Sequence, residues 1–170
     1  EARVRPGTLH GLPAYPGDTV RLKLAVRSAR GLATAVGPAP RRDHLYCVCG
    51  VVGRPAARAQ TRVSSGAGDP VWNADLEIPE YFAGDSLEFV VIDSLAQPER
   101  NVLPSSSSAV YAPAMPNGIV GSAVLSAGQF FPYGYDSEMT LLSHGQGIAG
   151  LLRVKVAVAG FEAHLSRRDL

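Results

Sequence analysis

Residues 60–93, QTRVSSGAGDPVWNADLEIPEYFAGDSLEFVVID, decide the fold that this sequence predicts. Turn residues separate three strand-like stretches, so the segment indicates strand, turn, strand, turn, strand. Trp72, the only tryptophan of the chain, follows an Asp-Pro turn where the middle strand begins. Burial of an aromatic side chain of this size is worth several CH₂ equivalents, at about 25 cal/mol per Å² removed from water. We therefore expect Trp72 to fix the local structure.

The same alternation recurs along the rest of the chain. The expected strands are 20–27, 45–52, 58–63, 72–78, 87–92, 119–125, 139–142 and 151–158. The aromatic stretch 128–135, GQFFPYGY, is expected to be irregular, and no stretch has the periodicity of an amphipathic helix. Eight short strands separated by turn signals predict an all-β fold, an antiparallel β-sandwich.

The chain of 170 residues is long enough for one domain with a substantial core. We expect residues 1–18 to form an N-terminal arm or linker, 19–160 the β-sandwich and 161–170 a C-terminal tail or linker. The proline- and serine-rich segment 94–118 is expected to be a long loop, and loops of this length are often functional. Because the chain opens on Glu1 without an initiator methionine or an apolar signal core, we interpret it as part of a larger protein.

Charge and cysteine content restrict the partners and the compartment. The formal net charge of +1 argues against nucleic acid as a partner. Cys47 and Cys49 lie two apart in an expected strand, share one face and lack the geometry of an ordinary disulfide. Free buried thiols favour a reducing, cytoplasmic location. A metal site at Cys47, Cys49 and His44 would need further ligands, so no metal is expected there.

A basic stripe is the main feature of the expected surface. Arg58, Gln60 and Arg62 share one face of a strand, because side chains alternate with a period of two. An ordinary solvated sheet face gives the same pattern.

The motifs together resemble those of the C2 domain, the β-sandwich family that binds calcium and phospholipid. The similar stretches are LKLAVRSARGL, YCVC, QTRVSSGAGDPVWNADLEI, DSLEFVVID, GIVGSAVL and LLSHGQGIAGLLRVKV, which together cover about residues 19–159. The resemblance implies an eight-stranded antiparallel, C2-like β-sandwich. A first strand of the L-x-L-x-V type and a last strand G-L-L-R-V-K-V imply the type II topology.

The resemblance also implies where calcium ligands would stand. Asp43 falls close to the aspartate of the first loop region, and Asp93 matches the first aspartate of the third loop. The next two aspartates of that loop fall on Leu95 and Gly118, and residues 33–42 contain no carboxylate. Calcium takes 6 to 8 oxygen ligands, so Asp43 and Asp93 alone are insufficient.

We therefore expect no cofactor and no useful calcium binding. Arg41 and Arg42 flank Asp43, and we expect the two aspartates to pair with these arginines or with Arg100. Glu99 or Asp69 is the remaining way to complete one calcium site.

The first functional hypothesis is a membrane-targeting or docking module of a larger protein that binds anionic phospholipid without calcium. The residues expected to contact lipid are Arg58, Arg62, Arg41, Arg42 and Leu95. Attraction to an anionic surface is worth about 1 kcal/mol per basic residue, so weak peripheral attachment at a membrane follows.

The alternative hypothesis is a protein-interaction or scaffold module that uses the sheet face or the 94–118 loop. Tyr111 and Met115 are the candidate contacts in that loop. The aromatic residues of 128–135 could contribute to the contact, or they could cap one end of the core. An enzyme is not expected, because the four histidines are scattered and Ser143-His144 lacks a nucleophile elbow.

Overall fold

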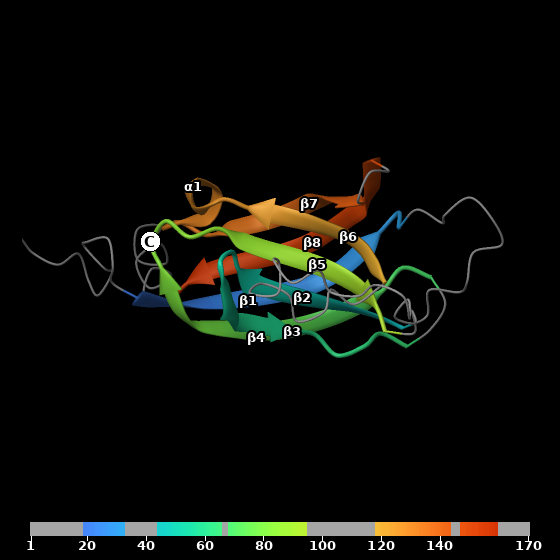
Figure 1. Ribbon diagram of the computed structural model, residues 1–170, viewed down its shortest axis with the longest axis horizontal. Helices are drawn as coiled ribbons and strands as arrows, with labels where there is room; N and C mark the ends of the chain where they lie inside the picture. The colour runs from blue at the N-terminus through green and yellow to red at the C-terminus, as the bar shows by residue number, and fades with distance from the viewer. Residues whose placement is uncertain (1–18, 33–43, 66–67, 95–117, 144–146, 160–170) are drawn as a thin grey trace, which may run out of the picture.

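The structure is a computed structural model that describes residues 19–32, 44–65, 68–94, 118–143 and 147–159. Within these residues, eight antiparallel strands lie in the spatial order β3-β2-β5-β6-β7-β8-β1-β4. β6 and β7 share a single paired position, Ser122 with Leu142, and the sheet folds over there into two layers. Figure 1 looks onto the layer β3-β2-β5-β6, with the layer β7-β8-β1-β4 behind it. The predicted all-β, eight-stranded antiparallel sandwich is confirmed.

The strands are generally longer than the sequence pattern predicts, because several continue past the last alternating residue. Their bounds are β1 Thr19–Arg30, β2 Leu45–Val51, β3 Arg54–Gln60, β4 Val71–Phe82, β5 Leu87–Asp93, β6 Ile119–Leu125, β7 Tyr135–Ser143 and β8 Gly147–Val158. The predicted arm, the C-terminal tail and residues 95–117 of the long loop lie outside the described residues.

The core lies between the two layers and is centred on large aromatic side chains. Trp72 on β4 is 1% exposed, and its Nε1 donates a hydrogen bond of 3.0 Å to the carbonyl oxygen of Leu45 on β2. Tyr81 and Phe89 are also fully buried. The prediction that Trp72 fixes the local structure is consistent with this burial, and the indole joins a strand of one layer to a strand of the other.

The third strand differs from its prediction. It spans Arg54–Gln60 instead of 58–63, because Gly53, with φ of 81°, closes a tight turn and pairing resumes at once. β3 is an edge strand, so Pro55 is tolerated without losing a sheet hydrogen bond. A register shift between Gly50 and Val51 absorbs the extra residues.

β4 also exceeds its predicted end and runs through Pro79 to Phe82. β4 is the edge strand of its layer, and the register with β1 shifts between Val20 and Leu22, opposite Pro79. A proline at an edge bulge leaves the sheet hydrogen bonds intact, which the sequence pattern alone could not indicate.

The aromatic stretch after β6 is more ordered than predicted. It forms a one-turn helix, α1 (Ala127–Phe130), in which Ser126 N–H donates to Gln129 Oε1 at 2.9 Å. Phe130 is 1% exposed, and its ring centroid lies 5.4 Å from that of Tyr81. Tyr133 is 76% exposed. Phe130 therefore caps the core, whereas Tyr133 lies at the surface.

Replacement of Trp72 by alanine tests the role of the indole. We expect Trp72→Ala to lower the free energy of unfolding by about 3–5 kcal/mol, because it leaves a cavity and removes one of the two hydrogen bonds that the Leu45 carbonyl accepts. Urea denaturation followed by circular dichroism measures the change. The neighbouring Val71 is 61% exposed, so Val71→Ala is the matched control and should change stability by less than about 0.5 kcal/mol. Equal losses for the two variants would contradict the central role of Trp72.

Candidate functional site

A shallow hollow on the outer face of the layer β3-β2-β5-β6 is the first candidate site. Its volume is about 230 Å³, and it lies over β2, β3 and β5. Gly50 on β2 pairs with Arg58 on β3 and with Glu88 on β5, so these three residues form one row across the face. Val48 and Val90 form the next row. The missing side chain of Gly50 creates the hollow between a cation and a carboxylate.

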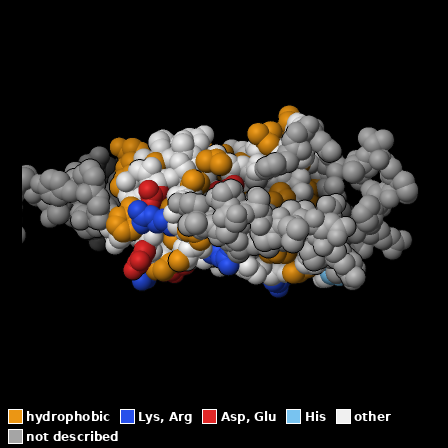
Figure 2. Space-filling model, viewed as in Figure 1, with side chains coloured by type: hydrophobic (Ala, Val, Ile, Leu, Met, Phe, Trp, Pro, Cys, Tyr) orange, Lys and Arg blue, Asp and Glu red, His pale blue; other side chains and the backbone are white. Residues whose placement is uncertain are grey.

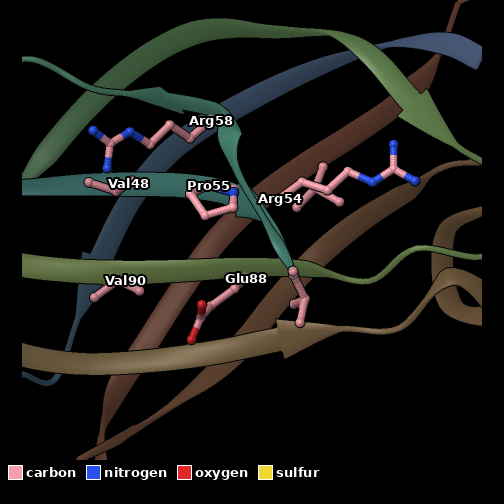
Figure 3. Close-up of a pocket in the computed structure, with 10 residues that line it drawn as sticks. Val48, Arg54, Pro55, Arg58, Glu88 and Val90 are labelled. Atoms are coloured by element: carbon pink, nitrogen blue, oxygen red, sulfur yellow. The ribbon is translucent and has the colours of Figure 1, made fainter. Parts of the chain in front are cut away.

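The two arginines of β3 have different roles. Figure 3 shows Arg58 lying along β2 toward Val48, whereas Arg54 extends in the opposite direction. Nη2 of Arg54 lies 3.1 Å from Oδ2 of Asp85, and the Arg54 guanidinium carbon lies 3.6 Å from the centroid of the Phe82 ring. Arg54 is therefore committed to the β4–β5 turn. Among the described residues, Arg58 has no carboxylate within ion-pairing distance.

Arg62, the other predicted lipid contact, is exposed but lies beyond the end of β3. The chain here remains tied to β2, because Thr61 N–H donates to Cys47 O at 2.9 Å and Cys47 N–H donates to Thr61 Oγ1 at 3.0 Å. Arg58 and Arg62 are thus both exposed, as the stripe predicts, although a regular strand does not connect them. Figure 2 shows that charged side chains are few on the described part of this face, with hydrophobic side chains between them.

Of the two predicted calcium positions, Asp43 and Asp93, the structure describes only Asp93, which lies at the loop end of the sandwich. Asp93 ends β5, is half-buried, and donates its backbone N–H to Gly118 O at 2.8 Å. Asp69, the remaining candidate within the described residues, is exposed and close to Arg30. The pKa of Arg30 is raised mainly by its hydrogen bond and charge interaction with Glu138, and also by the charge of Asp69.

Across the described part of the chain, no group of three or more His, Cys, Asp or Glu side chains could hold a metal ion. Six site residues predicted from the sequence lie outside the described residues, namely Asp43, Arg41, Arg42, Leu95, Tyr111 and Met115.

The two cysteines are free, as the sequence predicts, and both lie in the core. Burial raises the pKa of Cys47 to about 12, and it also raises the pKa of Cys49 well above its ordinary value. A thiol must ionise to act as a nucleophile or a metal ligand. Cys47 and Cys49 therefore serve as small apolar core residues.

The sequence did not reveal the partners of these arginines. Glu88 in the hollow and the Arg54–Asp85 pair both depend on the register between strands far apart in the sequence. The available signal was the alternation within β2, which places Cys47 and Cys49 inward and therefore Val48 and Gly50 outward.

Comparison with known proteins identifies the fold. The sequence profile of the C2 domain family matches residues 20–103. The chain contains a C2 domain. The resemblance predicted from the motifs is thereby confirmed, and C2 domains are modules that bind membranes and lipids.

Solved C2 domains superpose on this C2 domain at low sequence identity. The C2A domain of a plant extended synaptotagmin 1 has a TM-score of 0.60 at 16% sequence identity. This match covers 86% of the present chain and 98% of the synaptotagmin chain. The C2A–C2B domains of extended synaptotagmin 2 have a TM-score of 0.56 at 15% identity, and the match covers 82% of the present chain and 39% of the synaptotagmin chain. Human GIVD cytosolic phospholipase A2 has a TM-score of 0.55 at 14% identity, and the match covers 85% of the present chain and 17% of the phospholipase chain. These likenesses show the fold alone.

This chain therefore spans nearly all of the first neighbour but less than half of the other two. No protein of curated function matches it. Among the described residues, no helix has the length and apolar character needed to cross a membrane.

Thiol labelling tests the assignment of Cys47 and Cys49 to the core. Because their pKa values are raised, both thiols stay protonated at about pH 8, where an ordinary exposed cysteine is partly ionised. We expect no reaction with an aromatic disulfide reagent in the native domain and reaction of both thiols in denaturant, measured by absorbance. Rapid labelling of the native domain would contradict the buried, protonated state.

Proposed function

We propose that this C2 domain is a non-catalytic docking module that attaches a larger protein to anionic phospholipid surfaces without calcium. The single observation that carries the proposal is Arg58, an exposed guanidinium beside the hollow at Gly50. With no carboxylate among the described residues in ion-pairing distance, Arg58 can direct its donors toward a phosphate group. Arg62 supplies a second exposed cation, and the alternation of the sequence assigns it to the same face as Arg58.

The expected affinity of a single domain is low. Each basic residue near an anionic membrane contributes about 1 kcal/mol, so Arg58 and Arg62 together contribute about 2 kcal/mol. Glu88, across Gly50 from Arg58, opposes part of this attraction. Stable attachment therefore depends on further domains of the parent chain, which raise the effective concentration at the surface.

The carboxylates support a calcium-independent mode. Calcium requires 6 to 8 oxygen ligands, and Asp93 is the one predicted calcium residue within the described residues. Asp69 lies near the positive charge of Arg30, which disfavours a divalent cation at that position. The unreactive thiols of Cys47 and Cys49 likewise support a binding role over catalysis, and free cysteines suit a reducing, cytoplasmic compartment.

A protein-interaction role is the second candidate, and one observation favours it. Val124 on β6 and Leu142 on β7 are 58% and 54% exposed, so apolar surface is present where the two layers meet. Apolar side chains of this size at a surface are suitable contacts for a protein partner.

Liposome co-sedimentation with neutral and anionic vesicles, each with calcium and with a chelator, tests the proposed function. We expect binding to anionic vesicles only, equal in calcium and in chelator. The double variant Arg58→Gln/Arg62→Gln should weaken this binding about 30-fold, from the loss of about 2 kcal/mol.

The matched control is Arg21→Gln/Arg153→Gln, which removes the same charge from the other layer. Arg21 and Arg153 already pair with Glu77 and Asp136, at 2.7 and 2.8 Å. This control should bind nearly as the native domain does. Binding that requires calcium would overturn calcium independence. Equal losses of vesicle binding in the two double variants would show that the net charge of the domain, and not the position of Arg58 and Arg62, determines binding. Absence of binding in all four conditions would favour the protein-interaction role.

A further inference from the structure

The outward-facing cations of the layer β7-β8-β1-β4 fall into a paired and an unpaired set. Three arginines lie 2.7 or 2.8 Å from carboxylates of the same layer, in the pairs Arg21–Glu77, Arg30–Glu138 and Arg153–Asp136. Lys23, Arg27 and Lys155 are exposed, and no carboxylate lies within ion-pairing distance of them among the described residues. These three unpaired cations all line one hollow, on the outer face of β8, β1 and β4.

Two lysines and two alanines form the centre of this hollow, which has a volume of about 330 Å³. Because β1 pairs with β8, Lys23 lies opposite Ala157, and Ala25 lies opposite Lys155. The lysines therefore occupy one diagonal of a square on the outer face, and the alanines occupy the other. Diagonal neighbours on paired strands have Cβ atoms roughly 7–8 Å apart. The short alanine side chains leave the space between the two lysines open, and we call this space the lysine hollow.

Lys23 and Lys155 are the only lysines of the chain, in which arginine supplies all the other Lys and Arg positions. They belong to the first and the last strand, so only sheet pairing brings them together. An ammonium group is a compact charge with three donors on a flexible stem, whereas a guanidinium group is a planar fork. Two ammonium groups on one diagonal can therefore converge on a single anion between them.

The charges around the lysine hollow indicate the charge of its ligand. Asp75 on β4 lies opposite Ala25, is exposed, and has no cation within ion-pairing distance among the described residues. Glu77, the other acid of the lining, is compensated by Arg21. Three unpaired cations and one unpaired carboxylate leave a positive excess of about two charges. A phosphomonoester carries about −1.5 to −2 charges at pH 7, so the excess matches a monoester better than a singly charged diester.

We propose that the lysine hollow binds the phosphate group of a soluble phosphomonoester, with Lys23 and Lys155 on either side of the phosphate and Arg27 at the rim. Its volume is at the lower end of the range for small-molecule sites, which suits a phosphate with a small organic group. The lysine hollow and the hollow at Gly50 lie on the outer faces of opposite layers (Figure 1). A domain attached to a membrane through Arg58 therefore turns the lysine hollow toward water. The choice of a soluble source rests on the proposed function, whereas the charge and geometry of the lysine hollow do not.

NMR titration of the chain, labelled with isotopes in lysine, tests the proposal with two matched probes. Methyl phosphate is a monoester, and dimethyl phosphate is the corresponding diester with about one charge fewer. The side chains of Lys23 and Lys155 give the only lysine signals. We expect methyl phosphate to shift both signals and to bind about tenfold more tightly than dimethyl phosphate, because it carries the larger charge. Equal binding of the two probes, or no shift of either signal, would overturn the assigned ligand.

Two single substitutions locate the site. Lys23→Gln should weaken the binding of methyl phosphate about tenfold, measured on the remaining signal of Lys155. Arg58→Gln removes the same charge from the opposite layer and should leave the response of both lysine signals unchanged. Circular dichroism confirms that each variant is folded. Equal losses in the two variants would attribute the binding to net charge and overturn the assignment to the lysine hollow.

Co-sedimentation with vesicles of phosphatidylcholine and phosphatidic acid distinguishes a soluble ligand from a lipid, because phosphatidic acid carries a phosphomonoester. We expect the double variant Lys23→Gln/Lys155→Gln to sediment with these vesicles as the native chain does. Loss of vesicle binding in this variant would overturn the soluble source and assign the lysine hollow to a lipid headgroup. Binding of methyl phosphate by a native chain that binds no vesicles would overturn membrane docking alone and would support the soluble ligand.

Discussion

The hydrogen bond between the Trp72 indole and the Leu45 carbonyl is the contact on which the two layers depend. β4 belongs to one layer and β2 to the other, so a side chain of the first satisfies a backbone group of the second inside the core. The same carbonyl also accepts the backbone N–H of Ser64 at 2.8 Å, and both of its lone pairs are thus occupied. In a low-dielectric interior these bonds are strong, and loss of either leaves a costly unpaired group. The start of β2, the chain after β3 and the start of β4 are therefore held in one arrangement.

Burial explains which parts of the fold could be predicted from sequence. β1, β5 and β8 alternate between apolar and polar residues because one face of each is buried, and that alternation is a local property of the sequence. β3 was misplaced because its position depends on the Gly53 turn and on the register shift opposite Gly50, neither of which leaves a side-chain pattern. β4 continues through Pro79 for a similar reason, since only its place at the edge of a layer makes the proline acceptable.

The candidate site was predictable to a smaller extent. The period of two correctly placed Arg58 on an exposed face, but charge alone could not distinguish it from Arg54. Asp85, the partner of Arg54, lies in the turn after β4, and Phe82 beneath the guanidinium lies at the end of β4. Both are brought to Arg54 by the sandwich and not by sequence proximity. Which arginine remains available to a ligand is thus a property of tertiary structure.

The hollow depends on the absence of a side chain at Gly50, whereas the fold does not. Its nearest neighbours to a hypothetical Cβ are Cβ of Arg58 at 3.5 Å and the carbonyl of Ala57 at 3.6 Å, both at ordinary contact distance. The backbone therefore tolerates a side chain here, in contrast to Gly121, where the layers meet too closely. A related chain could fill the hollow at position 50 and keep the same sandwich. Ligand preference can therefore diverge at this position through single substitutions that leave stability nearly constant.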